Sequence, residues 1–215
     1  MAQQDRAQRT RTALVEAAAE MFDRHGFALA SLSAISAHAG VSKGALHFHF
    51  ANKDALARAV GAAAAQRLAR ITDRREDPGR GGALQLVIDA THDLARGLGE
   101  DAVLRVGFGV DRMPGPDGAA DDSRQQVKAW VEQTLRRAAD EGTTARGLPP
   151  EVVAATLVAT VLGLGTLAAR PGPAALTVLW DLLLPRLTAD GAVGDLVAAG
   201  TAGTCRPDTE PGAAR

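Results

Sequence analysis

The segment from Ser31 to Phe50 contains two short helical patterns that are separated by a tight turn, Gly40-Val41-Ser42. In the first pattern, residues 32–39, apolar side chains recur at spacings of three and four residues, as they do on one face of a helix. In the second pattern, Leu46 and Phe50 are four residues apart and share a face. Two short helices across a glycine-bearing turn are typical of a helix-turn-helix. This feature confines the start of the chain to a small helical unit.

Small polar residues and glycines predict where the neighbouring helices begin and end. Residues 9–28 have the pattern of an amphipathic helix, and Gly26 stops it as a C-cap glycine would. Ser31 and Ser42 are placed to cap the second and third helices, and Asn52 is placed to cap a fourth. Residues 1–60 therefore hold three helices and the start of a fourth, which we assign to an N-terminal head.

The rest of the chain predicts a helical body and a tail. A polar stretch rich in glycine and charge, residues 72–82, follows the fourth helix. Further helices are predicted at residues 83–98, 102–113, 123–142, 149–169 and 174–187. We assign residues 61–188 to this body, and we expect residues 189–215, which are rich in Gly, Ala, Thr and Pro, to form a disordered tail.

The composition favours an all-α fold. Aromatic residues make up only 3% of the chain and tyrosine is absent, whereas alanine and glycine are abundant. A β-sandwich would need more β-branched and aromatic residues, and close-packed helices would not. The single cysteine, Cys205, cannot form an intramolecular disulfide, and no secretion signal opens the sequence, so we expect a cytoplasmic protein.

The charge distribution points to specific contact with DNA rather than to coating of nucleic acid. The net charge is −1, but residues 1–60 carry +2 and the remainder carries −3. The first residues of the second helix in such a motif reach the base edges, and other cations fix the register on the phosphates. The predicted DNA contacts are Arg6, Arg11, Ser31, Ser33, Ser42, Lys43, Gly44, His47, His49 and Lys53.

Several other classes of protein are not favoured. The uncharged run from Val152 to Ala169 just reaches the length of a membrane span, but it consists mostly of Ala, Gly, Thr and Val, and no second span exists. His47 and His49 are two residues apart and point away from each other, which is poor geometry for a metal. The sequence contains no glycine-rich phosphate loop and no G-x-S-x-G motif. We therefore expect no enzyme, no cofactor, no metal and no membrane span.

Residues 6–58 resemble the DNA-binding head of the tetracycline-repressor (TetR) family, through "AAAEMFDRHGF" and "LSAISAHAGVSKGALHFHFANKDAL". The resemblance implies that Lys43, Gly44 and an aromatic side chain at position 47 face a double-stranded DNA operator. His47 stands where the family usually has a tyrosine. An imidazole N–H can also donate a hydrogen bond to a phosphate.

Three segments look like one branch of that family, the γ-butyrolactone receptors that control antibiotic production in high-GC bacteria: "MAQQDRAQRTR", "AVLRVGFGV" and "KAWVEQTLRRAADEG". This resemblance implies a repressor that binds a near-palindromic operator and is released by a small lactone-like inducer. It also implies that Trp130 lines the ligand pocket. Weaker candidates for that pocket are Phe108, Leu86, His92, Gln133 and Thr160. A pocket glutamine found in some relatives on the fourth helix has no clear match here.

The family forms homodimers through its last two long helices, which implies an interface in residues 149–187. The residues expected in it are Ala159, Gly163, Leu167, Leu176, Trp180 and Leu183. Three alternatives stay open: a drug- or antibiotic-sensing regulator of the same fold, a ligand-blind relative, and a helical small-molecule carrier or enzyme. The last class would not need the arginines near the N-terminus or Lys43.

Overall fold

The computed structural model describes residues 2–73, 81–109, 119–166, 172–189 and 192–201. These residues are helical throughout, and their only β pairing is an isolated bridge between Thr144 and Thr188. The expected all-α fold is confirmed. The helices are α1 (Ala2–Leu29), α2 (Leu32–His38), α3 (Lys43–His49), α4 (Lys53–Asp73), α5 (Gly82–Glu100), α6 (Ala102–Gly107), α7 (Ala119–Asp140), α8 (Pro150–Thr166) and α9 (Gly172–Leu187), followed by the short 3-10 helix η1 (Ala192–Asp195).

The capping residues of the head act as the sequence predicts. Ser31 Oγ accepts a hydrogen bond from the backbone N–H of Ala34 at 3.1 Å, and Ser42 Oγ accepts one from Ala45 at the same distance. Asn52 Oδ1 caps α4 by accepting from the N–H of Ala55 at 2.8 Å. Each cap satisfies a backbone donor that the first turn of a helix leaves without a partner.

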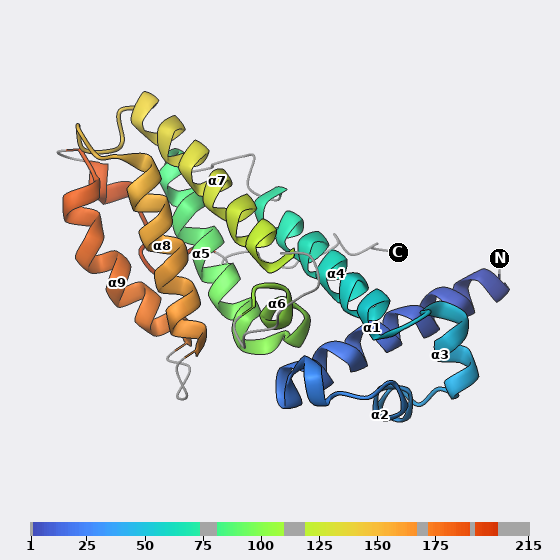
Figure 1. The fold of residues 1–215 in the computed structure, drawn as a ribbon. Coiled ribbons are helices and arrows are strands. Elements are labelled where there is room, and N and C mark those ends of the chain that lie inside the picture. Colours follow the sequence, from blue (N-terminus) through green and yellow to red (C-terminus); the bar gives the residue numbers. More distant parts are fainter. Residues whose placement is uncertain (1, 74–80, 110–118, 167–171, 190–191, 202–215) are drawn as a thin grey trace, which may run out of the picture.

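Gly26 interrupts α1 near its end. Its φ of 76° and ψ of 156° are not helical, so the regular helix stops there, and one further turn leads to Leu29. A positive φ is accessible to glycine at little cost because glycine has no Cβ. The predicted end of the first helix is therefore confirmed in position, and the chain changes direction there before it enters α2 (Figure 1).

Two hydrophobic cores divide along α4. The head core gathers side chains of α1 to α3 and of α4 as far as Ala64, and it is completed by Val103 and Val106 from α6. The body core begins at Leu68 on α4 and includes side chains of α5 to α9. One helix thus belongs to both cores. The division of the chain at residue 60 stays a prediction, since the packing of α4 changes only between Ala64 and Leu68.

In the body, α5 packs against α7, α8 and α9, and in the head-to-body junction α6 packs against both α1 and α4 (Figure 1). Trp180 on α9 is fully buried, and its indole N–H donates to Thr91 Oγ1 of α5 at 3.0 Å. Gly107 of α6 lies directly against Ala64 of α4, where an added Cβ would come within 2.1 Å of the Ala64 Cβ. This close approach is what allows α6 to sit between head and body.

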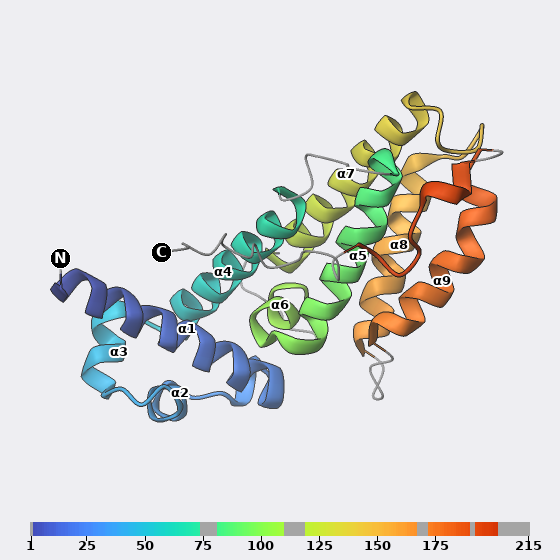
Figure 2. The ribbon, with the colours of Figure 1, turned by 180° about the vertical axis from the view of Figure 1, so that it is seen from behind.

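The C-terminal segment differs from its prediction. Residues 192–201 lie along α5 instead of being disordered (Figure 2), and residues 202–215 lie outside the described residues. The predicted helix over 102–113 is also shorter, because α6 ends at Gly107. Residues 110–118, which contain the rest of that prediction, lie outside the described part of the chain.

Candidate nucleic-acid interface and effector cavity

The third helix has a buried side and an exposed side, as its pattern predicts. Leu46 and Phe50 are 1% and 4% exposed and belong to the head core. Lys43 and His47, which share the opposite face, are exposed. The apolar pair therefore fixes α3 on the head, while the polar pair is available to a partner.

Gly44 lies on that exposed side, and the protein itself does not require a glycine there. A Cβ at this position would meet only Ser42 Oγ, at 3.9 Å, among the described atoms, and its φ is not in the left-handed region. The missing side chain therefore leaves room for something outside the protein. A nucleic-acid backbone that approaches the start of α3 closely would need such room.

Phe48 is a surface residue that the sequence interpretation missed. It is 82% exposed, and its ring meets the His49 ring edge-to-face with 5.2 Å between centroids. Phe48 is two residues from both Leu46 and Phe50, so on a helix it cannot share their buried face. That spacing was the available signal. An exposed aromatic ring on this helix can make apolar contact with a thymine methyl group in the major groove.

The remaining predicted contacts on the head lie at its surface. Arg6, Arg11, Ser31 and Ser33 are exposed, and His49 is half-buried. The guanidinium of Arg11 lies 5.3 Å from the centroid of the Phe50 ring, which holds this arginine beside α3. In both ribbon views the N-terminal part of α1 lies next to α3, so these cations border the same surface (Figures 1 and 2).

Lys53 has a different role from the predicted one. Its Nζ donates to the carbonyl oxygens of Phe27, Ala28 and Ala30 at 2.8, 3.2 and 3.1 Å, and it lies 4.4 Å from the centroid of the Phe27 ring. An ammonium group has three donors, and all three are used. Lys53 therefore ties the last turn of α1 to the start of α4, and the phosphate contact expected of it is corrected.

Trp130 borders a cavity in the body, between α4, α5, α7 and α8. The cavity is lined by Leu68, Ile71, Thr72, Ala90, Thr91, Leu94, Val127, Trp130, Val131, Val158 and Val161. Its volume is about 10 Å³, which is the room that one water needs. We call this space the Trp130 cavity. Its walls are almost wholly apolar, and its closure means that any larger guest requires the helices to separate.

The weaker pocket candidates do not line the Trp130 cavity. Phe108 is fully buried in the body core and Leu86 is 3% exposed, but neither borders the space. Gln133 is exposed, and Thr160 Oγ1 donates to the carbonyl of Thr156 on the outer side of α8. His92 is buried on the side of α5 that faces the C-terminal segment. These five expectations are corrected, because each helix turns the side chain elsewhere.

Thr91 is a cavity residue that the sequence interpretation missed. Its hydroxyl donates to the carbonyl of Ile88 at 2.7 Å and accepts from the indole of Trp180, so it links the cavity wall to α9. A larger hollow, of about 140 Å³, lies farther along the body, where Leu84, Leu135, Arg146 and Leu187 form part of its lining. It shares no residue with the Trp130 cavity.

The outer face of α8 and α9 is apolar, but only part of it was predicted. Ala159 and Gly163 are exposed on α8. Leu176 and Trp180 are 1% and 0% exposed in the body core, and Leu183 is half-buried against it, so these three do not form a free face. Leu167 lies outside the described residues. The exposed apolar residues that were missed are Val152, Val178 and Leu182, at 56%, 59% and 71% exposure. We call Val152, Ala159, Gly163, Val178 and Leu182 the α8–α9 face.

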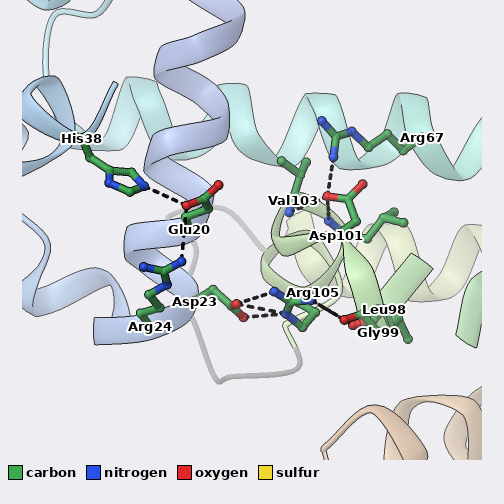
Figure 3. Close-up of polar contacts among 11 residues, drawn as sticks. Glu20, Asp23, Arg24, His38, Arg67, Leu98, Gly99, Asp101, Val103 and Arg105 are labelled. Carbon is green, nitrogen blue, oxygen red and sulfur yellow. Dashed lines mark hydrogen bonds and ion pairs between the residues drawn. The ribbon is translucent and has the colours of Figure 1, made fainter. Parts of the chain in front are cut away.

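Charged residues join the head to the body (Figure 3). Arg105 on α6 donates from Nε and Nη2 to the carboxylate of Asp23 on α1, with Nη2 to Oδ2 at 2.6 Å, and both side chains are 10% exposed. The other guanidinium nitrogen, Nη1, donates to the carbonyls of Leu98 and Gly99. A second pair links Arg67 on α4 to Asp101. These pairs transmit the position of α6 to α1 and α4.

Within the described ranges, no helix is both long enough and apolar enough to cross a membrane.

Comparison with known proteins covers the head and most of the body. Residues 14–60 match the model of the bacterial regulatory proteins of the tetR family. The chain is 29% identical to the A-factor receptor protein of Streptomyces griseus, over 91% of this chain and 70% of that receptor. It is 30% identical to the HTH-type transcriptional regulator UidR of Escherichia coli K12, over 65% of this chain and 71% of UidR. These relatives are a receptor and a transcriptional regulator rather than enzymes.

Solved structures show the same architecture. A γ-butyrolactone receptor described as an ArpA-like protein superposes with a TM-score of 0.75 at 28% identity, over 90% of this chain and 96% of that one. The TetR family protein CprB from Streptomyces coelicolor, solved with its biological operator sequence, gives a TM-score of 0.71 at 32% identity, over 86% of this chain and 91% of that one. The likeness therefore extends over both the helix-turn-helix head and the helical body.

Proposed function

Because the chain belongs to the tetR family of bacterial regulatory proteins and is a transcriptional regulator of that family, we propose that it represses transcription in response to a small γ-butyrolactone-like signal. In this proposal it binds a near-palindromic DNA operator as a homodimer in the cytoplasm, and the signalling molecule releases it. The observation that carries the proposal is the exposed face of α3, where Lys43 and His47 stand beside the open space at Gly44.

The head supplies two kinds of contact with DNA. Ser42, Lys43, Gly44, His47 and Phe48 enter the major groove, where polar groups and an apolar ring can distinguish base edges. Arg6 and Arg11 contact phosphates on either side, together with Ser31, Ser33 and His49, and set the register. Two heads that meet the same face of the duplex require half-sites separated by about 34 Å or a multiple of that distance.

The second copy of the chain packs on the α8–α9 face. Val178 and Leu182 are four residues apart on α9 and share an exposed stripe, and Ala159 and Gly163 on α8 allow a partner helix to approach closely. Two such faces form a four-helix interface. An exposed apolar stripe of this kind is otherwise unfavourable in water.

The effector enters at the Trp130 cavity. Trp130 and the apolar side chains around it suit the alkyl part of an amphiphile, and the relatives of this chain include proteins named as receptors for the A-factor and for γ-butyrolactones. An effector weakens operator binding only to the extent that it binds one conformer of the protein more tightly than the other. Here the favoured conformer is the one with an open cavity, and α4 carries the change to the head.

A second candidate is a regulator of the same family that senses a different molecule, such as an antibiotic, or none. The closed state of the Trp130 cavity, at about 10 Å³, favours this alternative, because an alkylated lactone does not fit without rearrangement. The two candidates share the DNA half of the mechanism and differ only in what opens the body.

Fluorescence anisotropy on DNA from upstream of the protein's own gene tests the proposal. The salt series of the native chain gives the number of phosphate contacts. Lys43→Ala is expected to weaken specific binding about tenfold, and Gly44→Val is expected to abolish it by filling the open space. The matched control is Lys128→Ala, on a lysine of the body that pairs with Glu132. Unchanged affinity in both head variants would contradict a DNA-binding role for α3.

The same DNA complex tests the effector. An alkyl-substituted γ-butyrolactone is titrated into it, and release of the DNA supports the lactone proposal. Persistence of the complex at saturating lactone, with specific DNA binding intact, would reject the lactone and leave the second candidate. Trp130→Ala serves as the comparison, because the lost indole should alter the response to the lactone and leave binding to DNA unchanged.

A further inference from the structure

One side of α5 carries a row of polar side chains that is buried although it is not part of the Trp130 cavity. Gln85, Asp89 and His92 are 2%, 3% and 1% exposed, and their spacing of four and three residues places them on one helical face. Polar groups are buried at a cost unless they find hydrogen-bond partners. Their partners come from a segment more than 100 residues later in the sequence, residues 197–201.

The row recognises backbone rather than side chains. Gln85 pairs with both backbone groups of Val197, because its Nε2 donates to the carbonyl at 3.2 Å and its Oε1 accepts from the N–H at 2.8 Å. His92 Nε2 is 2.8 Å from the carbonyl oxygen of Ala198. Asp89 accepts from the N–H of Thr201 at 2.7 Å and from its hydroxyl. This is a built groove for an extended peptide.

The segment fits the groove because its residues are small at the point of closest approach. Gly200 has a φ of 77°, and a Cβ there would lie 3.2 Å from the His92 ring and 3.4 Å from Asp89 Oδ1. Any larger residue at this position would meet both the strain of the left-handed region and the groove wall. We call residues 196–201 the strap.

We propose that the strap is a tethered peptide ligand of α5 whose docking holds the Trp130 cavity closed. At 100° per residue, the centre of the Gln85, Asp89 and His92 row lies about 180° around α5 from the centre of the cavity residues Ala90, Thr91 and Leu94. The helix is therefore held between the strap on one side and the cavity on the other. When the strap leaves, α5 gains room to retreat from Trp130, and the cavity widens.

The chemistry of the groove suits release. An apolar groove would lose its hydrophobic contact when opened, but these side chains exchange hydrogen bonds with the strap for hydrogen bonds with water, so the net difference is small. His92 Nδ1 is buried without a hydrogen-bond partner among the described residues, and water satisfies it once the strap departs. Docking is thus strong enough to order the segment and weak enough to be reversed.

The inference rests on the proposed function only in treating the Trp130 cavity as the effector site. Its test needs neither operator nor effector. The probe is 1-anilinonaphthalene-8-sulfonate, an amphiphile that fluoresces in apolar cavities. Binding is measured for the native chain, for a chain ending at Gly191 and for a matched control ending at Thr201, which keeps the strap and removes only residues 202–215.

The strapless chain is expected to bind the probe about fivefold more tightly than either the native chain or the control, the effect of about one net hydrogen bond, or ~1 kcal/mol. The peptide AVGDLVAAGT, residues 192–201, is expected to restore the native affinity when added to the strapless chain. Equal affinity in the strapless chain and the control would overturn the proposal.

Two further variants guard the result. Gly200→Val in the full chain releases the strap without a truncation, so it replaces the strapless chain if circular dichroism shows that the latter does not fold. Ala90→Leu fills the Trp130 cavity and is expected to cancel the gain in affinity. If the gain persists with the cavity filled, the probe binds elsewhere, for example in the hollow near Arg146, and the proposal is wrong. Failure of the chain to bind any operator would contradict the proposed function and leave this result unaffected.

Discussion

The carboxylate of Asp23 on α1 and the guanidinium of Arg105 on α6 form a two-pronged ion pair that joins the head to the body. Both side chains are 90% buried, and Arg105 also donates to two backbone carbonyls at the end of α5. One arginine therefore connects α1, α5 and α6. Any movement of α6 relative to the head must stretch this pair or carry α1 with it.

Asp23→Asn is expected to destabilise the protein by about 3 kcal/mol, because it leaves the buried charge of Arg105 without its counter-charge. Urea unfolding followed by circular dichroism measures the loss. The control is Glu20→Gln on the same helix, where the pairs with His38 and Arg24 are more exposed, and there we expect less than about 1 kcal/mol. Equal losses in both variants would show that the buried pair has no special weight.

Phe48→Ala is expected to weaken operator binding about tenfold and to leave the unfolding midpoint unchanged. The ring is 82% exposed and contributes little to the head core, so its value lies in contact with a partner. Anisotropy measures the affinity and thermal unfolding measures the stability. Replacement of individual thymines by uracil in the operator should reproduce the loss at one position. A drop in stability with unchanged DNA affinity would make Phe48 a structural residue.

Lys53→Ala and Arg6→Ala are expected to have opposite signatures. Loss of three charge-assisted hydrogen bonds in Lys53→Ala should destabilise the head by about 2 kcal/mol and leave the salt dependence of DNA binding unchanged. Arg6→Ala should leave stability unchanged and reduce the slope of log K against log salt by about 1. Unfolding and salt-series anisotropy on both variants decide the matter. A reduced slope for Lys53→Ala would restore its predicted phosphate contact.

Leu182→Glu is expected to convert a dimer to a monomer, because it places a charge in the centre of the α8–α9 face. Sedimentation equilibrium measures the change. Leu29→Glu is the matched control, since Leu29 is a comparably exposed leucine, at 83%, that lies on the head and outside that face. A dimer that survives Leu182→Glu would place the interface elsewhere.

The sequence predicted best where the cause is local. Ser31, Ser42 and Gly26 act within a few residues of their own positions, through a cap or a backbone angle, and these predictions are confirmed. Leu46 and Phe50 were assigned correctly to the buried side because α3 has polar residues on its other face. A helix with two distinct faces states its own orientation.

The prediction failed where a helix is apolar all round or where the partner is distant. On α9, leucine and valine occupy every face, so the pattern could not separate the buried Trp180 from the exposed Leu182. The strap resembles a disordered tail by composition, and its order depends on side chains of α5 that are 112 residues away. Lys53 stood beside a DNA-binding motif, but the carbonyls freed by the break at Gly26 take its donors instead.

The shared helix α4 limits how this protein can be taken apart or recombined. Because Val103 and Val106 complete the head core, a fragment ending at residue 60 would leave an apolar hole where α6 belongs. A chimera that exchanges DNA-binding heads between relatives at that point would inherit a mismatched seam. To transplant the head as a working cassette, an engineer would have to move α6 with it, together with the stretch of α4 up to Ala64.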